Sequence, residues 1–190
     1  MKEALFYSLL GFASGSVMYS WLLPKLIQGV DVMAESEDGN PGTYNAFQLA
    51  GKPVGTLCLL GDLAKGFVPV YIAAQRMDTA SLYFAPVIAA PVLGHMFSPM
   101  LRGRGGKGIA ASFGALLGLL PWNYSVFALA APYVLLSTIA RIRNHAVRSV
   151  VSYLIFAGIC VAADPPSVAL GCSLITGAVV ARHCPELRAK

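Results

Sequence analysis

The residues best suited to chemistry lie in a glycine-rich basic segment that runs from Arg102 to Gly108, with the sequence R-G-R-G-G-K-G. Glycines let the backbone approach a ligand closely, and arginine and lysine side chains bind oxyanions. A helix that begins near Gly108 would add its positive N-terminal end. The spacing differs from that of the nucleotide-binding P-loop, and the alternative interpretation is a basic loop against anionic lipid. The segment predicts a phosphate site built by Arg104, Gly105, Gly106, Lys107 and Gly108.

A second polar segment has the sequence D-G-N-P-G from Asp38 onward and reaches Asn45 three residues later. Gly39 and Gly42 permit tight turns, and successive backbone amides in such a turn can converge on an anion. The side-chain amides of Asn40 and Asn45 add donors. The segment predicts a turn that can bind an anion, and the alternative is a solvated loop.

Asp62 and Lys65 lie inside an apolar segment, at a spacing that places both on one helix face. Ionisable residues in such segments are costly and usually face a partner or water. The pair either locks two helices together or forms the floor of a polar pocket, and the sequence leaves both open. We expect His95 to support the same pocket. His183 is a candidate polar or catalytic group, although a lone histidine is more often a satisfied polar residue.

Several other catalytic patterns are missing from the sequence. No histidine has an aspartate five positions on, and no G-x-S-x-G nucleophile motif occurs. The four cysteines show neither C-x-x-C nor zinc spacing. The sequence therefore predicts no metal site, no cofactor and no enzyme nucleophile.

The composition places these segments in a membrane protein. The 190 residues are 56% hydrophobic and 12% charged, with a mean hydropathy of +0.65. Soluble domains carry about 25% charged residues, and a chain this short cannot hide so much apolar surface in its own core. The formal charge of +5 is read as loop lysines and arginines rather than as a nucleic-acid surface.

The chain is predicted to be a single all-α membrane domain over residues 1–190 with about seven transmembrane helices. A crossing needs about 17–25 residues, so the fourth segment is short, and five or six crossings are the alternative. The seven apolar segments are Leu5–Leu23, Val54–Ala74, Leu82–Met100, Ile109–Leu120, Tyr124–Ile139, Val147–Val161 and Val168–Val180.

Basic residues give the predicted orientation. With seven crossings, one side keeps only Lys2 and Arg76, and the other side has the remaining lysines and arginines through to Lys190, apart from Lys65 inside the second segment. The positive-inside rule then places the N-terminus outside and the C-terminus in the cytoplasm. The polar segments would all face the cytoplasm, and a transporter is disfavoured because no internal repeat is visible.

Taken together, these segments resemble the bacterial acyl-phosphate:glycerol-3-phosphate acyltransferase family of the PlsY type. The resemblance runs through nearly the whole chain in order. It rests on Gly94-His95-Met-Phe followed by Gly105-Gly106-Lys107-Gly108-Ile-Ala, on Gly39-Asn40-Pro-Gly42-Thr-Tyr-Asn45, on Asp62-Leu-Ala-Lys65-Gly66, and on Gly15-Ser16 and His183.

The resemblance implies acyl transfer from a fatty acyl phosphate to the sn-1 hydroxyl of glycerol 3-phosphate, giving lysophosphatidate for phospholipid synthesis. It also implies a location in the bacterial inner membrane, with the active face cytoplasmic. No enzyme nucleophile is needed, because the donor is already activated. The implied catalytic residues are Asp38, Asn40, Lys107 and His183, and the implied phosphate ligands are Gly39, Gly42, Asn45, Arg104 and the segment from Gly105 to Gly108.

The chain departs from the family pattern at three polar positions. Asp38 replaces the serine before G-N, Gln48 replaces an arginine, and Glu186 replaces the asparagine of H-x-x-N. These departures support the alternative of a non-catalytic or differently specific membrane homologue that binds a phosphorylated lipid precursor.

Overall fold

The computed structural model describes residues 1–188, and this part of the chain is all helical, with no strand. Lys190, counted above among the basic residues, lies outside the described residues. The elements in order are α1 (Lys2–Ser16), α2 (Tyr19–Gln28), α3 (Val32–Glu35), α4 (Thr43–Ala74), η1 (Leu82–Phe84), α5 (Ala85–Met96), η2 (Pro99–Leu101), α6 (Ile109–Leu117), α7 (Ser125–Thr138), α8 (His145–Ala163) and α9 (Pro166–Arg188).

Each of the seven predicted apolar segments is largely helical, with two differences at the start of the chain. The first segment is interrupted, because Val17 has an extended backbone and separates α1 from α2. The second helix begins at Thr43 instead of Val54 and contains a break at Gly51, where φ is 74°. The region predicted as a loop between Leu23 and Val54 therefore contains the second half of α2, all of α3 and the first turns of α4.

Four helical stretches are long and apolar enough to cross a membrane, namely Thr43–Ala74, Leu82–Leu101, His145–Ala163 and Pro166–Leu187. The outer faces of the bundle also expose many large apolar side chains, such as Leu5, Phe127 and Val161. A water-soluble protein of this size rarely exposes so much apolar surface. The structure thus supports a membrane protein, with α1, α6 and α7 shorter than a full crossing.

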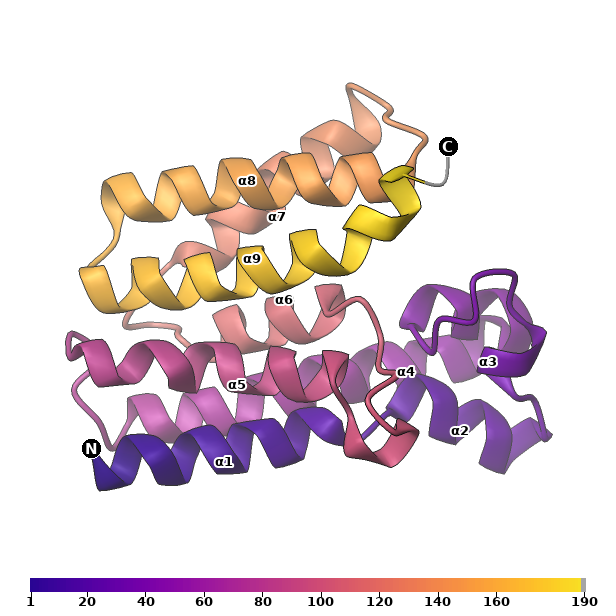
Figure 1. Ribbon diagram of the computed structural model, residues 1–190, viewed down its shortest axis with the longest axis horizontal. Coiled ribbons are helices and arrows are strands. Elements are labelled where there is room, and N and C mark those ends of the chain that lie inside the picture. Colours follow the sequence, from indigo (N-terminus) through magenta and orange to yellow (C-terminus); the bar gives the residue numbers. More distant parts are fainter. Residues whose placement is uncertain (189–190) are drawn as a thin grey trace.

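The helices lie roughly side by side, with α5 between α1 and α9 (Figure 1). Helices α4 and α6 pack very closely, because Gly114 faces the carbonyl oxygen of Leu63 and Gly66 faces that of Ala111. A methyl group at either glycine would overlap the opposing backbone. This contact fixes α6, and with it the glycine-rich loop that precedes α6, against the long helix α4.

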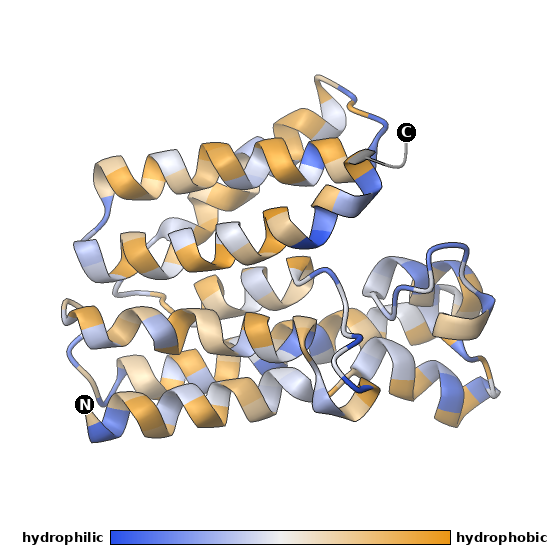
Figure 2. Cartoon of the chain, in the orientation of Figure 1, coloured by the Kyte–Doolittle hydropathy of each residue, from blue (hydrophilic) through white to orange (hydrophobic). Residues whose placement is uncertain are grey.

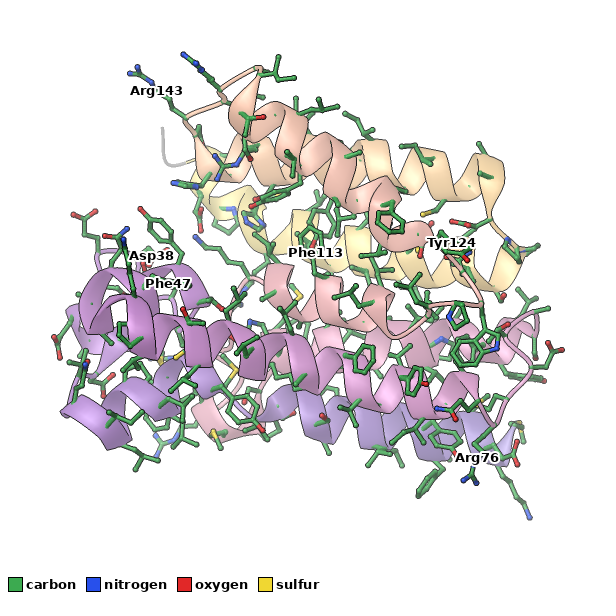
Figure 3. The ribbon with its side chains drawn as sticks, turned by 180° about the vertical axis from the view of Figure 1, so that it is seen from behind. Asp38, Phe47, Arg76, Phe113, Tyr124 and Arg143 are labelled. Carbon is green, nitrogen blue, oxygen red and sulfur yellow. The ribbon has the colours of Figure 1, made fainter. Side chains whose placement is uncertain are left out.

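The polar connections gather at one end of the bundle. The start of α1 and the end of α9 lie at opposite ends of the bundle (Figure 1), and hydrophilic residues concentrate in the loops near the end of α9 (Figure 2). Figure 3 shows Asp38 and Arg143 at this end and Arg76 and Tyr124 at the other. Local caps set two of these connections: Asp31 accepts hydrogen bonds at the start of α3, and Asn144 does so at the start of α8.

Candidate active site

A cavity of about 1250 Å³ opens at the polar end of the bundle. Its mouth is polar and is formed by the loop before α4, by Lys107 and by the start of α8. Its inner part is apolar and lies among α4, α6 and α7, where it is lined by Leu59, Leu63, Phe113, Leu117 and Tyr133. Phe113 lies in the middle of the bundle (Figure 3). The cavity therefore offers a polar head site and an apolar channel to one ligand or to two.

The glycine-rich loop is held against the end of α5 by backbone hydrogen bonds. The Gly105 N–H donates to the carbonyl oxygen of Met96, and the Gly106 N–H donates to that of His95, both at 3.1 Å. Arg182 of α9 donates to the carbonyl oxygen of Gly105 at 2.7 Å. A side chain at Gly105 would overlap the His95 carbonyl, so this close approach requires glycine.

The N-terminus of α6 opens onto the cavity. The helix follows Gly108, whose φ is 84°, and no side chain of the described residues caps it. Gly108, Ile109 and Ala110 all line the cavity. The first amides of a helix lack intrahelical acceptors and carry partial positive charge. In contrast to α8, which Asn144 caps, α6 presents amides that can bind an anion.

Lys107 lies at the mouth of the cavity between two carboxylates. Its Nζ is 2.9 Å from Asp38 Oδ2 and 2.7 Å from Glu186 Oε1, and its side chain is 21% exposed. Burial lowers the pKa of Lys107, but the hydrogen bonds to Glu186 and Asp38 outweigh burial and leave the pKa above its usual value. The lysine is therefore a permanent cation.

Asp38 organises the loop that faces Lys107. Its Oδ1 accepts hydrogen bonds from Asn45 Nδ2 at 2.7 Å and from the Asn40 N–H at 3.1 Å. Asn45 also donates to the Asn40 carbonyl at 2.9 Å. Burial raises the pKa of Asp38, but the bonds from Lys107 and Asn45 leave the pKa below its usual value. Asp38 is thus an ionised acceptor, and the amide of Asn45 is used within the loop.

His183 lines the same cavity from α9 and is almost fully buried. Its Nδ1 lies 2.8 Å from the carbonyl oxygen of Val179. A carbonyl only accepts, so Nδ1 must donate and carry the ring proton in the neutral side chain. This hydrogen bond leaves Nε2 as the proton acceptor of the ring.

Asp62, Lys65 and His95 form a buried cluster beneath the site. Asp62 Oδ1 lies 2.8 Å from Lys65 Nζ and 3.9 Å from His95 Nδ1. Asp62 also accepts hydrogen bonds from Ser20 and from Thr43 at the start of α4. Among the described residues, the lining of the large cavity includes His95 but neither Asp62 nor Lys65. The cluster therefore ties α2, α4 and α5 together, which is the helix-locking alternative for the pair.

The comparisons with known proteins decide the family. Residues 5–189 match the family model described as glycerol-3-phosphate acyltransferase. The chain belongs to this family. A glycerol-3-phosphate acyltransferase of Pseudomonas aeruginosa is 34% identical over 181 residues, which are 95% of this chain and 92% of the relative. One from Myxococcus xanthus is 37% identical over 136 residues, which are 72% and 69% of the two chains.

A solved structure gives the same fold. It is a crystal structure of PlsY, an integral membrane glycerol 3-phosphate acyltransferase, in its glycerol 3-phosphate form. The TM-score is 0.85 with 26% sequence identity, and the match covers 97% of this chain and 90% of the other. The resemblance inferred from the sequence is therefore confirmed.

Most of the predicted site residues lie together in this member of the glycerol-3-phosphate acyltransferase family. The larger cavity is lined by Asp38, Asn40, Gly42, Asn45, His95, Lys107, Gly108 and His183. Gly39, Arg104 and Gly105 line a smaller adjoining cavity of about 500 Å³. Gly106 packs against the His95 ring instead. Of the three positions that depart from the family pattern, Asp38 and Glu186 both contact Lys107, and Gln48 lines the larger cavity.

Sequence reasoning missed a basic group at the start of α8. Arg143, His145 and Arg148 line the cavity opposite the loop before α4. Arg148 lies over the Tyr133 ring at 5.6 Å and contacts His145 Nδ1 at 2.6 Å, and the His145 ring is 5.1 Å from that of Tyr44. The sequence feature that could have indicated this group is the cluster of basic residues directly after a predicted polar connection, at the start of a helix.

Proposed function

We propose that this cavity is the active site of an acyl-phosphate-dependent glycerol-3-phosphate acyltransferase, which transfers a fatty acyl group to the sn-1 hydroxyl and yields lysophosphatidate and inorganic phosphate. Family membership supports the reaction. One observation in the structure carries the assignment of the site: the uncapped N-terminus of α6 and Lys107 meet at the mouth of a cavity whose inner part is apolar.

The glycerol 3-phosphate is assigned to the polar mouth. The amides at the start of α6 donate to the phosphate oxygens, and Lys107 supplies a compact positive charge. Asn40 and the turn from Gly39 to Gly42 form the facing wall, held in place by Asp38 and Asn45. Such positioning alone can supply about 7–11 kcal/mol of the barrier when both reactants are aligned.

The acyl donor is assigned to the junction of the two parts of the cavity. Its chain lies along Leu59, Leu63 and Phe113, and its phosphate lies at the mouth near Arg143 and Arg148. The apolar channel keeps the chain out of water, where its exposure would cost about 0.8 kcal/mol per methylene group. Phosphate is a good leaving group, so the enzyme needs no covalent intermediate.

The hydroxyl of glycerol 3-phosphate attacks the acyl carbonyl, and the C–O bond to the phosphate breaks. The hydroxyl proton must leave as the new ester bond forms. We assign the acceptor of this proton to Nε2 of His183, since the bond from Nδ1 to Val179 leaves that nitrogen unprotonated. Asp38, ionised and held by three donors, serves to position Lys107 and Asn45.

The membrane arrangement is part of the proposal. The seven helical segments cross or enter the inner membrane of a bacterium, with the N-terminus outside and the polar end in the cytoplasm. The gathering of Lys107, Arg143 and Arg148 at one end supports this orientation. A water-soluble phosphate ester would then reach the cavity mouth directly, and the lipid-like donor would enter from the bilayer.

A second candidate function is supported by the two carboxylates on Lys107. In this alternative the chain is a homologue that binds a phosphorylated lipid precursor without transferring an acyl group, because the phosphate-binding cation is already paired. The apolar channel and the fold are the same in both cases.

One assay separates the two candidates. Purified protein in detergent is given acyl phosphate and labelled glycerol 3-phosphate, or acyl thioester as the alternative donor, and lysophosphatidate is measured. We expect turnover with acyl phosphate only, and at least a 100-fold loss in Lys107→Ala. The matched control is Lys25→Ala, because Lys25 pairs with Asp31 and does not line the larger cavity in the described part of the chain. Wild-type protein that binds the donor without turnover would favour the non-catalytic homologue.

A further inference from the structure

Lys107 and its two carboxylates stand between two cavities. The larger cavity extends to the apolar channel, and the smaller one is lined by the basic residues Arg104 and Arg182. Four residues line both cavities, and they therefore form the wall between them: Asp38, Asn40, Lys107 and Glu186. An anion that passes from the basic cavity to the α6 N-terminus has to pass this wall.

The charges in the wall oppose an anion. Asp38 and Glu186 each carry a negative charge, so together with Lys107 they sum to −1. Both carboxylates contact the same Nζ, at 2.9 and 2.7 Å, so a phosphate that approaches Lys107 must displace at least one of them. The small cavity beyond the wall contains Arg104 and Arg182 and attracts the same phosphate.

We propose that Asp38 and Glu186 form a carboxylate gate on Lys107 that sets how tightly the site binds phosphate monoesters and how readily it releases inorganic phosphate. This proposal rests on the proposed function, because it takes Lys107 as the phosphate ligand. The gate exchanges a carboxylate for a phosphate on one ammonium group as substrate binds, and restores the carboxylate as phosphate leaves.

The two carboxylates are not equivalent. Asp38 also accepts hydrogen bonds from Asn45 and from the Asn40 backbone, so it remains fixed when Lys107 turns away. In the described part of the chain, Lys107 is the single hydrogen-bond partner of Glu186. Glu186 lies in the last turn of α9 directly after Pro185, which cannot donate a backbone hydrogen bond. Glu186 is therefore the part of the gate that moves.

The gate has a measurable consequence for both phosphates in the reaction. Removing the charge of Glu186 frees Lys107 for the substrate, so the KM for glycerol 3-phosphate falls. The same change strengthens inhibition by inorganic phosphate, because product release loses the competing carboxylate. A residue that only supports the fold would change neither constant in this direction.

The experiment uses the full chain in detergent and compares Glu186→Gln, Asp38→Asn and the double variant. The matched control is Glu37→Gln, because Glu37 lines the larger cavity and is not paired with Lys107 in the described part of the chain. Initial rates give KM for glycerol 3-phosphate and Ki for inorganic phosphate. Calorimetric titration with inorganic phosphate gives its Kd without any turnover, and thermal unfolding confirms that each variant is folded.

We expect Glu186→Gln to lower KM, Ki and Kd together by about 2- to 5-fold, as for loss of one partly exposed ion pair, and Glu37→Gln to change each by less than twofold. An unchanged or higher Kd in Glu186→Gln overturns the gate, as does an equal effect in Glu37→Gln. If wild-type protein shows no acyl transfer, the proposed function fails, but the titration still decides whether the carboxylates compete with phosphate.

Discussion

The ammonium group of Lys65 donates a 2.6 Å hydrogen bond to the carbonyl oxygen of Val17, at the break between α1 and α2. The same ammonium group lies 2.8 Å from Asp62, and both side chains are almost fully buried. A break in a buried helix leaves backbone carbonyls without donors, and an unpaired polar group costs free energy in an apolar environment. Lys65 thus stabilises the break and neutralises Asp62 at the same time.

Replacing Lys65 should strongly destabilise the fold. In Lys65→Met, Asp62 loses its partner and the Val17 carbonyl loses its donor, so we expect a loss of about 3–5 kcal/mol, typical for breaking a buried ion pair. Thermal or denaturant unfolding in detergent measures this change. The double variant Asp62→Asn/Lys65→Met should recover part of the loss, because no charge is then buried alone. A single variant as stable as wild type would show that the pair is dispensable.

The pairing between Asp38 and Lys107 should persist across the whole physiological pH range. The pKa of Asp38 is lowered, so its contribution is present above its usual value of 3.8 and is lost as the pH falls below that value. The pKa of Lys107 is raised, so its contribution is present below 10.5 and is lost as the pH rises further. The pair is therefore ionised throughout the window between these values.

Any change of activity between pH 5 and 8 must then arise from another group. If His183 accepts the hydroxyl proton, kcat should fall as the pH falls and the ring becomes protonated. We expect this fall to remain in Asp38→Asn at an unchanged midpoint. In His183→Asn we expect it to disappear together with most of the activity. Rates measured with acyl phosphate across this pH range test both variants. Loss of this fall in Asp38→Asn would instead make Asp38 the proton acceptor.

The sequence identified most of the groups of the site but not their pairing. Asp62 and Lys65 are evident as charges in an apolar segment, whereas the break at Val17 lies inside the predicted first segment, and no proline directly follows Val17 to signal it. Asp38, Lys107 and Glu186 were each singled out, but their contact joins three segments far apart in the chain. The position of Arg148 in the site could not be predicted, because its contact with Tyr133 depends on how α7 and α8 pack.

The apolar part of the cavity should determine which acyl chains react. Leu63 lines the cavity from α4, whereas Leu60, one turn earlier, is 56% exposed on the outside of the helix. We expect Leu63→Trp to fill the channel and reduce kcat/KM for a 16-carbon acyl phosphate about 10-fold or more, since over-packing costs 1–3 kcal/mol. Short donors should be much less affected. Leu60→Trp is the matched control, and equal losses in both variants would place the chain elsewhere.

The proposed site requires that three separate polar segments share one side of the membrane. Single cysteines at Glu37, Arg104 and Arg143 sample the loop before α4, the glycine-rich loop and the start of α8, and a cysteine at Arg76 samples the opposite end of the bundle. Cys58, Cys160 and Cys172 are buried, and the partly exposed Cys184 is replaced by serine beforehand. An impermeant maleimide should label the first three positions only in inverted membranes and Arg76→Cys only in intact spheroplasts. Labelling of Glu37→Cys and Arg104→Cys from opposite sides would separate the two walls of the phosphate site, and Lys107 could not then meet Asp38.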